Sequence, residues 1–328
     1  MLLYNYSLGK YQINSRFVNL SAMEDYNKII ESLGVKFNKT KNFKIQASVT
    51  AENLYDVENT LMLVNKGKLR FGEDNEKATE GEILFVPGGK STTITYGSGE
   101  PERYHFEDFI NTRDRYLQTI DYSELPYTEQ ESFSIITFEA KVFDSVNFFA
   151  SLDLPAFVIQ SDRIRNIMKT ILEEADSFSA GHERIIKLQT DYVVVELFRY
   201  ILNKQLFVEK LATNITYFKD PRLIDIFAYI RENLQGDLSN KVLSNVANVS
   251  EDYVGQYFKM LTGINPQDYI EYQRMEQAVN LLRTTKYSIR EIGREVGYKD
   301  TAYFCRRFKM MFGIPAGKMR RRESLMNI

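Results

Sequence analysis

One eight-residue pattern occurs twice in the sequence, as YFKMLTGI at residues 257–264 and as RFKMMFGI at residues 307–314. A pair of apolar residues precedes each copy at the same offset of 50 residues, Tyr253 with Val254 and Tyr303 with Phe304. A repeat with this period indicates that one supersecondary unit is used twice. Each copy also follows a short amphipathic segment and a turn, which is typical of a helix-turn-helix.

The second copy carries the clearer local signals. Ile292 and Val296 predict the apolar face of a short helix. Gly293 lies where two helices would approach closely, and Gly297 suits the left-handed residue that ends a helix. The carboxylate of Asp300 can accept from the free amide groups of a following helix, so we expect the second helix to begin there.

The second helix of each unit should bury one face and expose the other. The inward side chains that we expect are Tyr253, Val254, Tyr257 and Phe258 in the first copy, and Tyr303, Phe304 and Phe308 in the second. We expect Ser250 to begin this helix in the first copy, and Gly263 and Gly313 to end the two helices.

Residues 268–283 between the copies predict one long helix. Sixteen residues at ~1.5 Å each span roughly 24 Å. Such a helix could hold two recognition helices in successive major-groove segments, which lie about one DNA turn (~34 Å) apart. A generic helical bundle is the alternative, and the paired caps and outward basic residues argue against it.

The charge of the chain is unevenly distributed. The net charge is −2, but residues 219–328 hold 18 Lys and Arg against 13 Asp and Glu. A basic C-terminal region behind an acidic body fits a protein that meets a polyanion, although many basic faces are only solvated surface. No apolar run reaches the ~20 residues of a membrane span, and the first residues lack the order of a signal peptide. We therefore expect a cytoplasmic protein.

The N-terminal two thirds change character along the chain. Residues 41–140 contain short alternating runs separated by Gly, Pro and Asp, which predict a β-sandwich or small barrel. Residues 164–175 and 182–205 predict two helices, and the second is apolar on several faces. That helix could pack against a second copy of the chain, which makes a homodimer our preferred interpretation, or it could be enclosed within one chain.

The segment from about residue 222 to residue 321 resembles the AraC/XylS family of bacterial regulators. The resemblance rests on SEDYVGQYFKMLTGINPQDYIEYQRMEQAVNLL and on SIREIGREVGYKDTAYFCRRFKMMFGIPAGKMRR. It implies seven helices, two major-groove recognition helices per chain, and control of transcription, usually as an activator that works with RNA polymerase. Arg307 departs from the family pattern, which commonly has an apolar residue there, so we expect it at the edge of the unit.

The family pattern implies that the exposed positions of each second helix read bases. Arg306 is the strongest candidate because arginine pairs bidentately with guanine, and Gln256 follows with adenine. An acidic first turn could instead be stabilised by the helix dipole, and we prefer that interpretation for Asp252. The candidates for base readout are Glu251, Gly255, Gln256, Thr301, Ala302, Cys305 and Arg306. The candidates for phosphate contact, which positions the protein without reading sequence, are Ser250, Lys259, Lys299 and Lys309.

The N-terminal half is similar to a cupin-type barrel, through GKLRFG at 67–72 and GEILFVPGG at 81–89. Metal-binding cupin enzymes use clustered histidines, whereas this chain has only His105 and His182. We therefore expect no metal site and no cofactor. Cys305 has no nearby histidine in the sequence, and no catalytic triad or phosphate-binding glycine loop is present. We expect a protein that is not an enzyme.

A binding role remains for the barrel. It could hold a small-molecule effector or could serve as a ligand-free scaffold for dimerisation. The effector residues are unknown; Lys90, Arg103 and His105 are candidates, although solvated charge or a structural hydrogen bond explains each equally simply.

The resulting fold class is α+β. We expect a cupin-like β-barrel over residues 1–150, helices for dimerisation over 151–218, and an all-α DNA-binding domain over 219–328. The two helix-turn-helix units should cover about 238–263 and 288–314. The predicted function is a sequence-specific regulator of transcription that binds double-stranded DNA. The alternatives are a cupin-type enzyme, or an architectural protein without an effector, that carries a DNA-binding tail.

Overall fold

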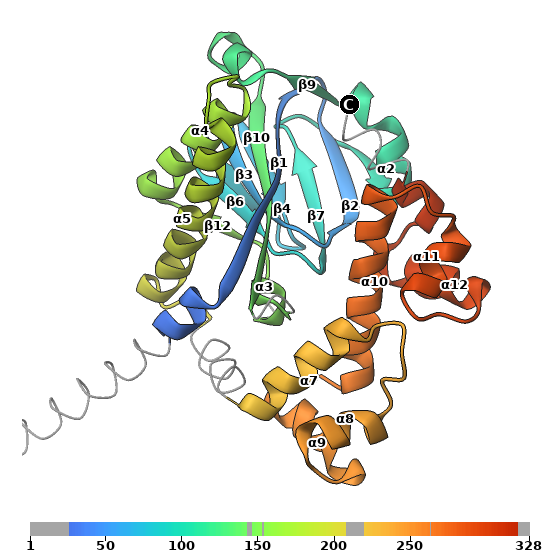
Figure 1. Ribbon diagram of the computed structural model, residues 1–328. Coiled ribbons are helices and arrows are strands. Elements are labelled where there is room, and N and C mark those ends of the chain that lie inside the picture. Colours follow the sequence, from blue (N-terminus) through green and yellow to red (C-terminus); the bar gives the residue numbers. More distant parts are fainter. Residues whose placement is uncertain (1–25, 143–145, 153, 208–219, 263, 321–328) are drawn as a thin grey trace, which may run out of the picture.

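The computed structural model describes residues 26–320, apart from 143–145, 153, 208–219 and 263. Its N-terminal part holds two β-sheets that face each other (Figure 1). The larger sheet has the order β12 (Phe157–Ile159), β6 (Ile83–Val86), β3 (Asn59–Lys66), β10 (Ser132–Val142), β1 (Leu33–Ile45) and β9 (Leu117–Ile120), with β11 (Val146–Asn147) beside β10. The smaller sheet has the order β5 (Glu76–Thr79), β4 (Lys68–Phe71), β7 (Lys90–Tyr96), β2 (Val49–Asp56) and β8 (Glu102–His105).

The larger sheet is buried on both faces. Successive side chains of a strand point to opposite faces, so the apolar run in β3 serves two cores. Met62 and Val64 pack between the two sheets. Leu61 and Leu63 pack on the other side, among the helices. The apolar core of the N-terminal part therefore has two layers.

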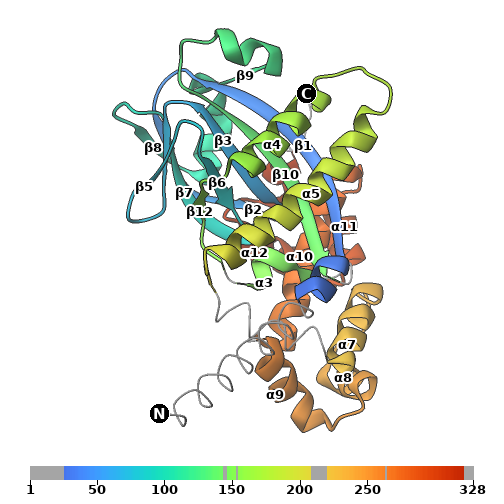
Figure 2. The ribbon, with the colours of Figure 1, turned by 90° about the vertical axis from the view of Figure 1, so that its left-hand side faces the viewer.

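Helices cover the outer face of the larger sheet (Figure 2). These are α3 (Phe148–Ser151), α4 (Asp162–Ala175) and α5 (His182–Asn203). Another helix, α2 (Phe106–Thr112), lies beside the smaller sheet and is followed by the 3-10 turns η1 (Arg113–Arg115) and η2 (Tyr122–Tyr127). Within the described residues, 26–31 are also helical.

The C-terminal part is helical (Figure 1). Its helices are α7 (Pro221–Glu232), α8 (Asn240–Ala247), α9 (Glu251–Thr262), α10 (Pro266–Thr284), α11 (Ile289–Glu295) and α12 (Thr301–Phe312). With the helical residues 316–320, the described residues contain the seven helical segments that the resemblance implies. The α+β fold class is therefore confirmed, while the domain boundaries at residues 150 and 218 remain predictions.

The local signals of the second helix-turn-helix are present in the structure. Asp300 Oδ1 accepts from the amide of Tyr303 at 2.6 Å, so α12 has the expected N-cap. Gly297 has φ +88° and Gly313 has φ +73°, both left-handed. A Cβ on Gly293 would lie 3.3 Å from the ring of Phe304, so the close helix approach is also confirmed. Gly263 lies outside the described residues.

Two predicted orientations are wrong. Tyr253 is 43% exposed and Tyr303 is 47% exposed, although both were expected to face inward. Val254 and Phe304 are fully buried, and the tyrosine before each lies about 100° away around the helix axis, on the side that faces solvent.

Candidate nucleic-acid interface

The outward faces of α9 and α12 are accessible to solvent. The fully buried residues of α12 include Phe304 and Phe308, and those of α9 include Val254 and Phe258. The base-readout candidates of both helices lie away from these residues. Glu251, Gln256, Ala302 and Arg306 are exposed, and Gly255, Thr301 and Cys305 are partly exposed.

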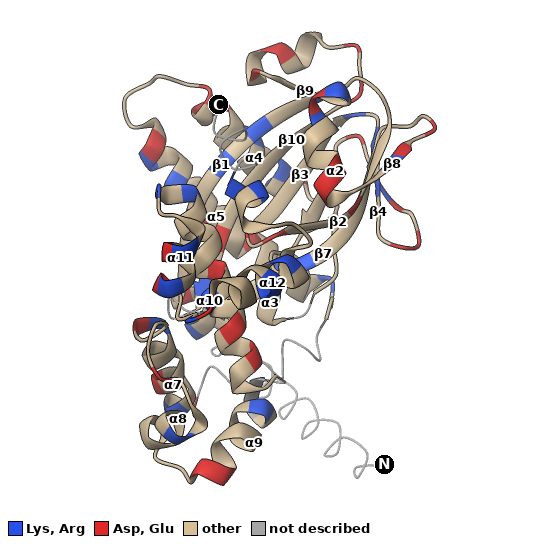
Figure 3. Ribbon diagram, turned by 90° about the vertical axis from the view of Figure 1, so that its right-hand side faces the viewer, with Lys and Arg blue, Asp and Glu red and all other residues tan. Residues whose placement is uncertain are grey.

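The phosphate candidates are also at the surface. Ser250, Lys259, Lys299 and Lys309 are all exposed. Figure 3 shows Lys and Arg on α12 and both signs of charge on α11, whereas α9 starts with acidic residues. Because α9 begins with Glu251 and Asp252, its N-terminal turn is less suited to an anionic backbone than that of α12.

Arg307 on α12 reaches α10, and its side chain is 32% exposed. Its guanidinium donates Nε–H and Nη2–H to the two carboxylate oxygens of Glu271 on α10. This bidentate hydrogen bond raises the pKa of Arg307. The residue therefore joins α12 to α10 through a charge-assisted hydrogen bond.

The helix α10 joins the two units. Its 19 residues give a length of about 28 Å. Asn265 precedes it and Pro266 occupies its first turn, where a missing amide hydrogen costs nothing. Arg274 on α10 donates to the carbonyl oxygen of Leu234 at 3.0 Å, which ties α10 to the loop before α8. The first unit is thus held against the same strut as the second.

The N-terminal part contacts α10 through largely buried ion pairs. Arg283 near the end of α10 donates to Glu58 and, at 3.1 Å, to Asp56. Lys141 on β10 lies 3.2 Å from Glu276 on α10. These pairs connect residues far apart in the sequence across one interface.

The carboxylates of this interface titrate abnormally. Burial and the charge of Asp56 raise the pKa of Glu58, although Arg283 opposes the shift. Burial likewise raises the pKa of Glu276, and Lys141 opposes it. Burial therefore disfavours the charged form of both carboxylates, and the nearby cations Arg283 and Lys141 offset part of that cost.

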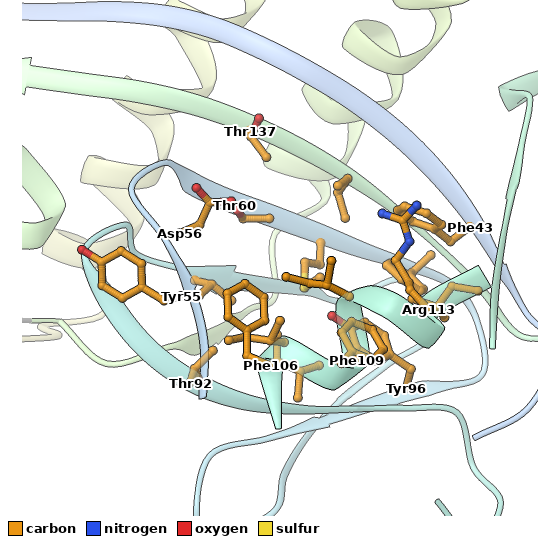
Figure 4. A pocket seen from close by; sticks show the side chains of 18 of the residues that line it. Phe43, Tyr55, Asp56, Thr60, Thr92, Tyr96, Phe106, Phe109, Arg113 and Thr137 are labelled. Atoms are coloured by element: carbon orange, nitrogen blue, oxygen red, sulfur yellow. The ribbon is translucent and has the colours of Figure 1, made fainter. Parts of the chain in front are cut away.

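An apolar cavity of about 140 Å³ lies between the two sheets (Figure 4). Aromatic and aliphatic side chains line most of it, and Arg113, Asp56 and Thr137 supply polar atoms. The effector candidates named from the sequence do not line this cavity. Lys90 borders a separate surface depression. Arg103 and His105 lie beside Glu52, at 2.9 Å and 3.4 Å.

One wall of this cavity also contacts the second helix-turn-helix unit. Tyr55 and Phe106 line the cavity and are buried in the same apolar cluster as α11 and α12. The ring of Tyr55 meets Phe312 edge-on at a centroid distance of 4.8 Å. Asp56 lines the cavity as well and pairs with Arg283. No sequence signal pointed to this wall, because its residues meet only in the folded chain.

The geometry agrees with known proteins. A family model described as a helix-turn-helix domain matches residues 243–322. The Transposon Tn10 TetD protein of Escherichia coli is 31% identical over 99 residues, which cover 30% of this chain and 72% of that protein. The chain belongs to the AraC/XylS family. The matched region is the part of the chain that carries α8 to α12.

Other AraC/XylS relatives extend the match. The lactose operon transcription activator of Staphylococcus xylosus is 28% identical over 169 residues, covering 50% of this chain and 57% of that protein. The chain thus spans about half the length of the first curated relatives that it matches. ToxT from Vibrio cholerae O395 has a similar fold, with a TM-score of 0.51, 11% identity, and coverage of 90% of this chain and 99% of that one.

The described residues contain no group of three or more His, Cys, Asp or Glu that could hold a metal ion. In the same part of the chain, no helix has the length and apolar character to cross a bilayer.

Proposed function

We propose that this protein is a sequence-specific, double-stranded DNA-binding regulator of transcription that acts in the cytoplasm. The observation that carries the proposal is the pair of helix-turn-helix units on one strut, each with an exposed second helix. Two relatives are named as transcription activators, which supports the proposal that this protein is an activator. We propose RNA polymerase as its partner. We propose no catalytic role.

Base readout is assigned to the exposed face of each recognition helix. Arg306 has a free fork of donors at the centre of the exposed face of α12, which suits O6 and N7 of guanine. Gln256 occupies the equivalent position of α9 and suits adenine. Lys259 and Lys309 flank these residues and suit phosphates. The acidic start of α9 makes the first unit the weaker contributor.

Selection of binding sites from a randomised duplex library with the full chain tests the proposal. We expect a recovered consensus, with a guanine whose replacement weakens binding by the wild type but not by Arg306→Ala. Arg115→Ala removes an arginine of the N-terminal part that is also exposed, and it should leave the consensus and affinity unchanged. Failure to recover any consensus would contradict sequence-specific binding.

The cavity between the sheets is proposed as the effector site. Its lining favours a small, largely apolar molecule, and Arg113 offers a donor at one end. Because Tyr55 and Asp56 belong both to the cavity and to the contact with α10 and α12, a bound molecule would shift the balance between arrangements of the two halves. A screen of apolar compounds by melting temperature tests this, with Met62→Trp as a variant whose cavity is filled.

A homodimer through α5 is also proposed. Ile185, Leu188 and Tyr192 are exposed at intervals of three and four residues on the side of α5 that faces away from the core. A second copy of this helix would cover the row. Sedimentation of the wild type as a dimer and of Leu188→Glu as a monomer would support the assignment, and an unchanged dimer would refute it.

A further inference from the structure

Both recognition helices expose the same two apolar side chains. Tyr253 and Tyr303 are 43% and 47% exposed, and Met260 and Met310 are 62% and 72% exposed. The members of each pair are 50 residues apart, so they occupy equivalent positions in the repeat. The residues around them differ between the copies, as Gln256 differs from Arg306.

These side chains form one row on each helix. With about 100° per residue, the tyrosine at the third helical position and the methionine at the tenth lie within roughly 20° of each other. The central residue, Gln256 or Arg306, lies about 40–60° to one side of this row, and the lysine lies beyond it. The Arg306 guanidinium carbon is accordingly 5.9 Å from the ring centroid of Tyr303.

Within the described residues, few contacts hold the side chains of this row against the rest of the protein. Met310 is in contact only with its neighbour Arg307 among the described polar contacts, at 4.0 Å from Nη1. Tyr303 lies 6.0 Å from the ring of Tyr298, yet almost half of it is exposed. Apolar side chains that are exposed side by side can mark a contact site. Because the row lies beside Arg306 and Lys309, whatever covers it must meet the same face as the DNA.

The major groove offers one apolar group that fits such a row. Among the four bases, only thymine presents a methyl group there, and it stands next to the donors and acceptors that Gln and Arg read. Resting on the proposed DNA-binding function, we propose that Tyr253 and Tyr303, extended by Met260 and Met310, contact thymine methyl groups. The two half-sites therefore share a thymine at the same relative position and differ at the adjacent base pair.

The test uses the duplex recovered by library selection with the full chain. Each thymine is replaced in turn by deoxyuridine, which removes only the methyl group. We expect wild-type affinity to fall about four-fold at two thymines separated by one helical turn, the effect of losing one buried methyl contact. Tyr303→Ala should bind the unmodified duplex more weakly and lose sensitivity to deoxyuridine in one half-site only. Tyr253→Ala should lose it in the other.

A matched control is Tyr127→Ala, which removes an 88% exposed tyrosine from the N-terminal part and should keep both sensitivities. If the affinity of the wild type were unchanged by deoxyuridine at every thymine, the inference would be overturned and the proposed function would stand. The inference would also be overturned if Tyr303→Ala bound all duplexes normally but failed to activate transcription. The row would then contact RNA polymerase and not DNA. Absence of any selected sequence would instead overturn the proposed function.

Discussion

Replacement of Arg283 by methionine should destabilise the protein strongly. The Arg283 side chain is 14% exposed, and its partners Glu58 and Asp56 are 6% and 22% exposed. Removing one member of a buried ion pair leaves a buried charge without compensation, which costs roughly 3–5 kcal/mol. Lys39 also lowers the pKa of Glu58 and remains in the variant, so part of the compensation for the Glu58 charge is kept. We therefore expect a loss of about 3 kcal/mol in the free energy of unfolding.

The loss of unfolding free energy in Arg283→Met should depend on pH, and the pKa of Glu58 sets the direction of that dependence. Burial already raises the pKa of Glu58, and removal of the Arg283 charge raises it further in the folded state. A carboxyl group whose folded pKa lies above its unfolded value stabilises the fold at low pH and less as the pH rises through the folded pKa. The deficit of the variant should consequently be smaller at pH 5 than at pH 8.

Equilibrium urea unfolding, followed by far-UV circular dichroism at both pH values, measures these differences. Arg283→Met with Glu58→Gln should recover more than half of the loss, since the more deeply buried of the two charges that faced Arg283 is then removed, and Asp56, which is 22% exposed, still accepts from the amides of residues 57 and 58. Arg103→Met breaks the exposed pair with Glu52 and should cost less than about 1 kcal/mol. A deficit for Arg283→Met no larger than that of Arg103→Met, or equal at the two pH values, would refute the reasoning.

Three further changes probe the DNA-binding half. Gly297→Ala should lower stability by about 2 kcal/mol or more in thermal unfolding, because φ is +88° and the new Cβ would meet the carbonyl oxygen of Leu234 at 2.4 Å; an unchanged melting temperature would contradict this. Asp300→Ala should cost about 1 kcal/mol through the lost cap on the amide of Tyr303, whereas Asp300→Ser should retain most of it. Lys309→Ala should reduce the slope of log affinity against log salt by about one, and a slope equal to that of the wild type would remove Lys309 from the phosphate contacts.

The helix-turn-helix units were predictable because their signals are local. Asp300, Gly297 and Gly313 each mark the beginning or end of a helix by backbone chemistry that the surrounding fold does not alter. The periodic apolar positions in residues 268–283 likewise placed a helix that proves to run from Pro266 to Thr284. Its extra residues lie at the ends, where periodicity says little.

The remaining features depend on contacts between distant residues. Tyr303 was expected inside because aromatic residues fill most cores, but its neighbour Phe304 occupies the inward position. The pairing of Arg283 with Glu58 joins residues 225 positions apart and has no periodic signature. The place of Arg113 at the cavity was not predictable either, because the turn after α2 brings this residue to the sheets only once the chain has folded.

A hydroxyl-radical footprint of the full chain on its selected duplex tests the central claim most directly. Two recognition helices on one strut predict two protected segments on the same face of the DNA, with centres about 10–10.5 base pairs apart. Arg306→Ala should weaken protection of one segment more than of the other. A single protected segment, or protection that spreads evenly over any sequence, would contradict the claim that both helices enter successive major grooves.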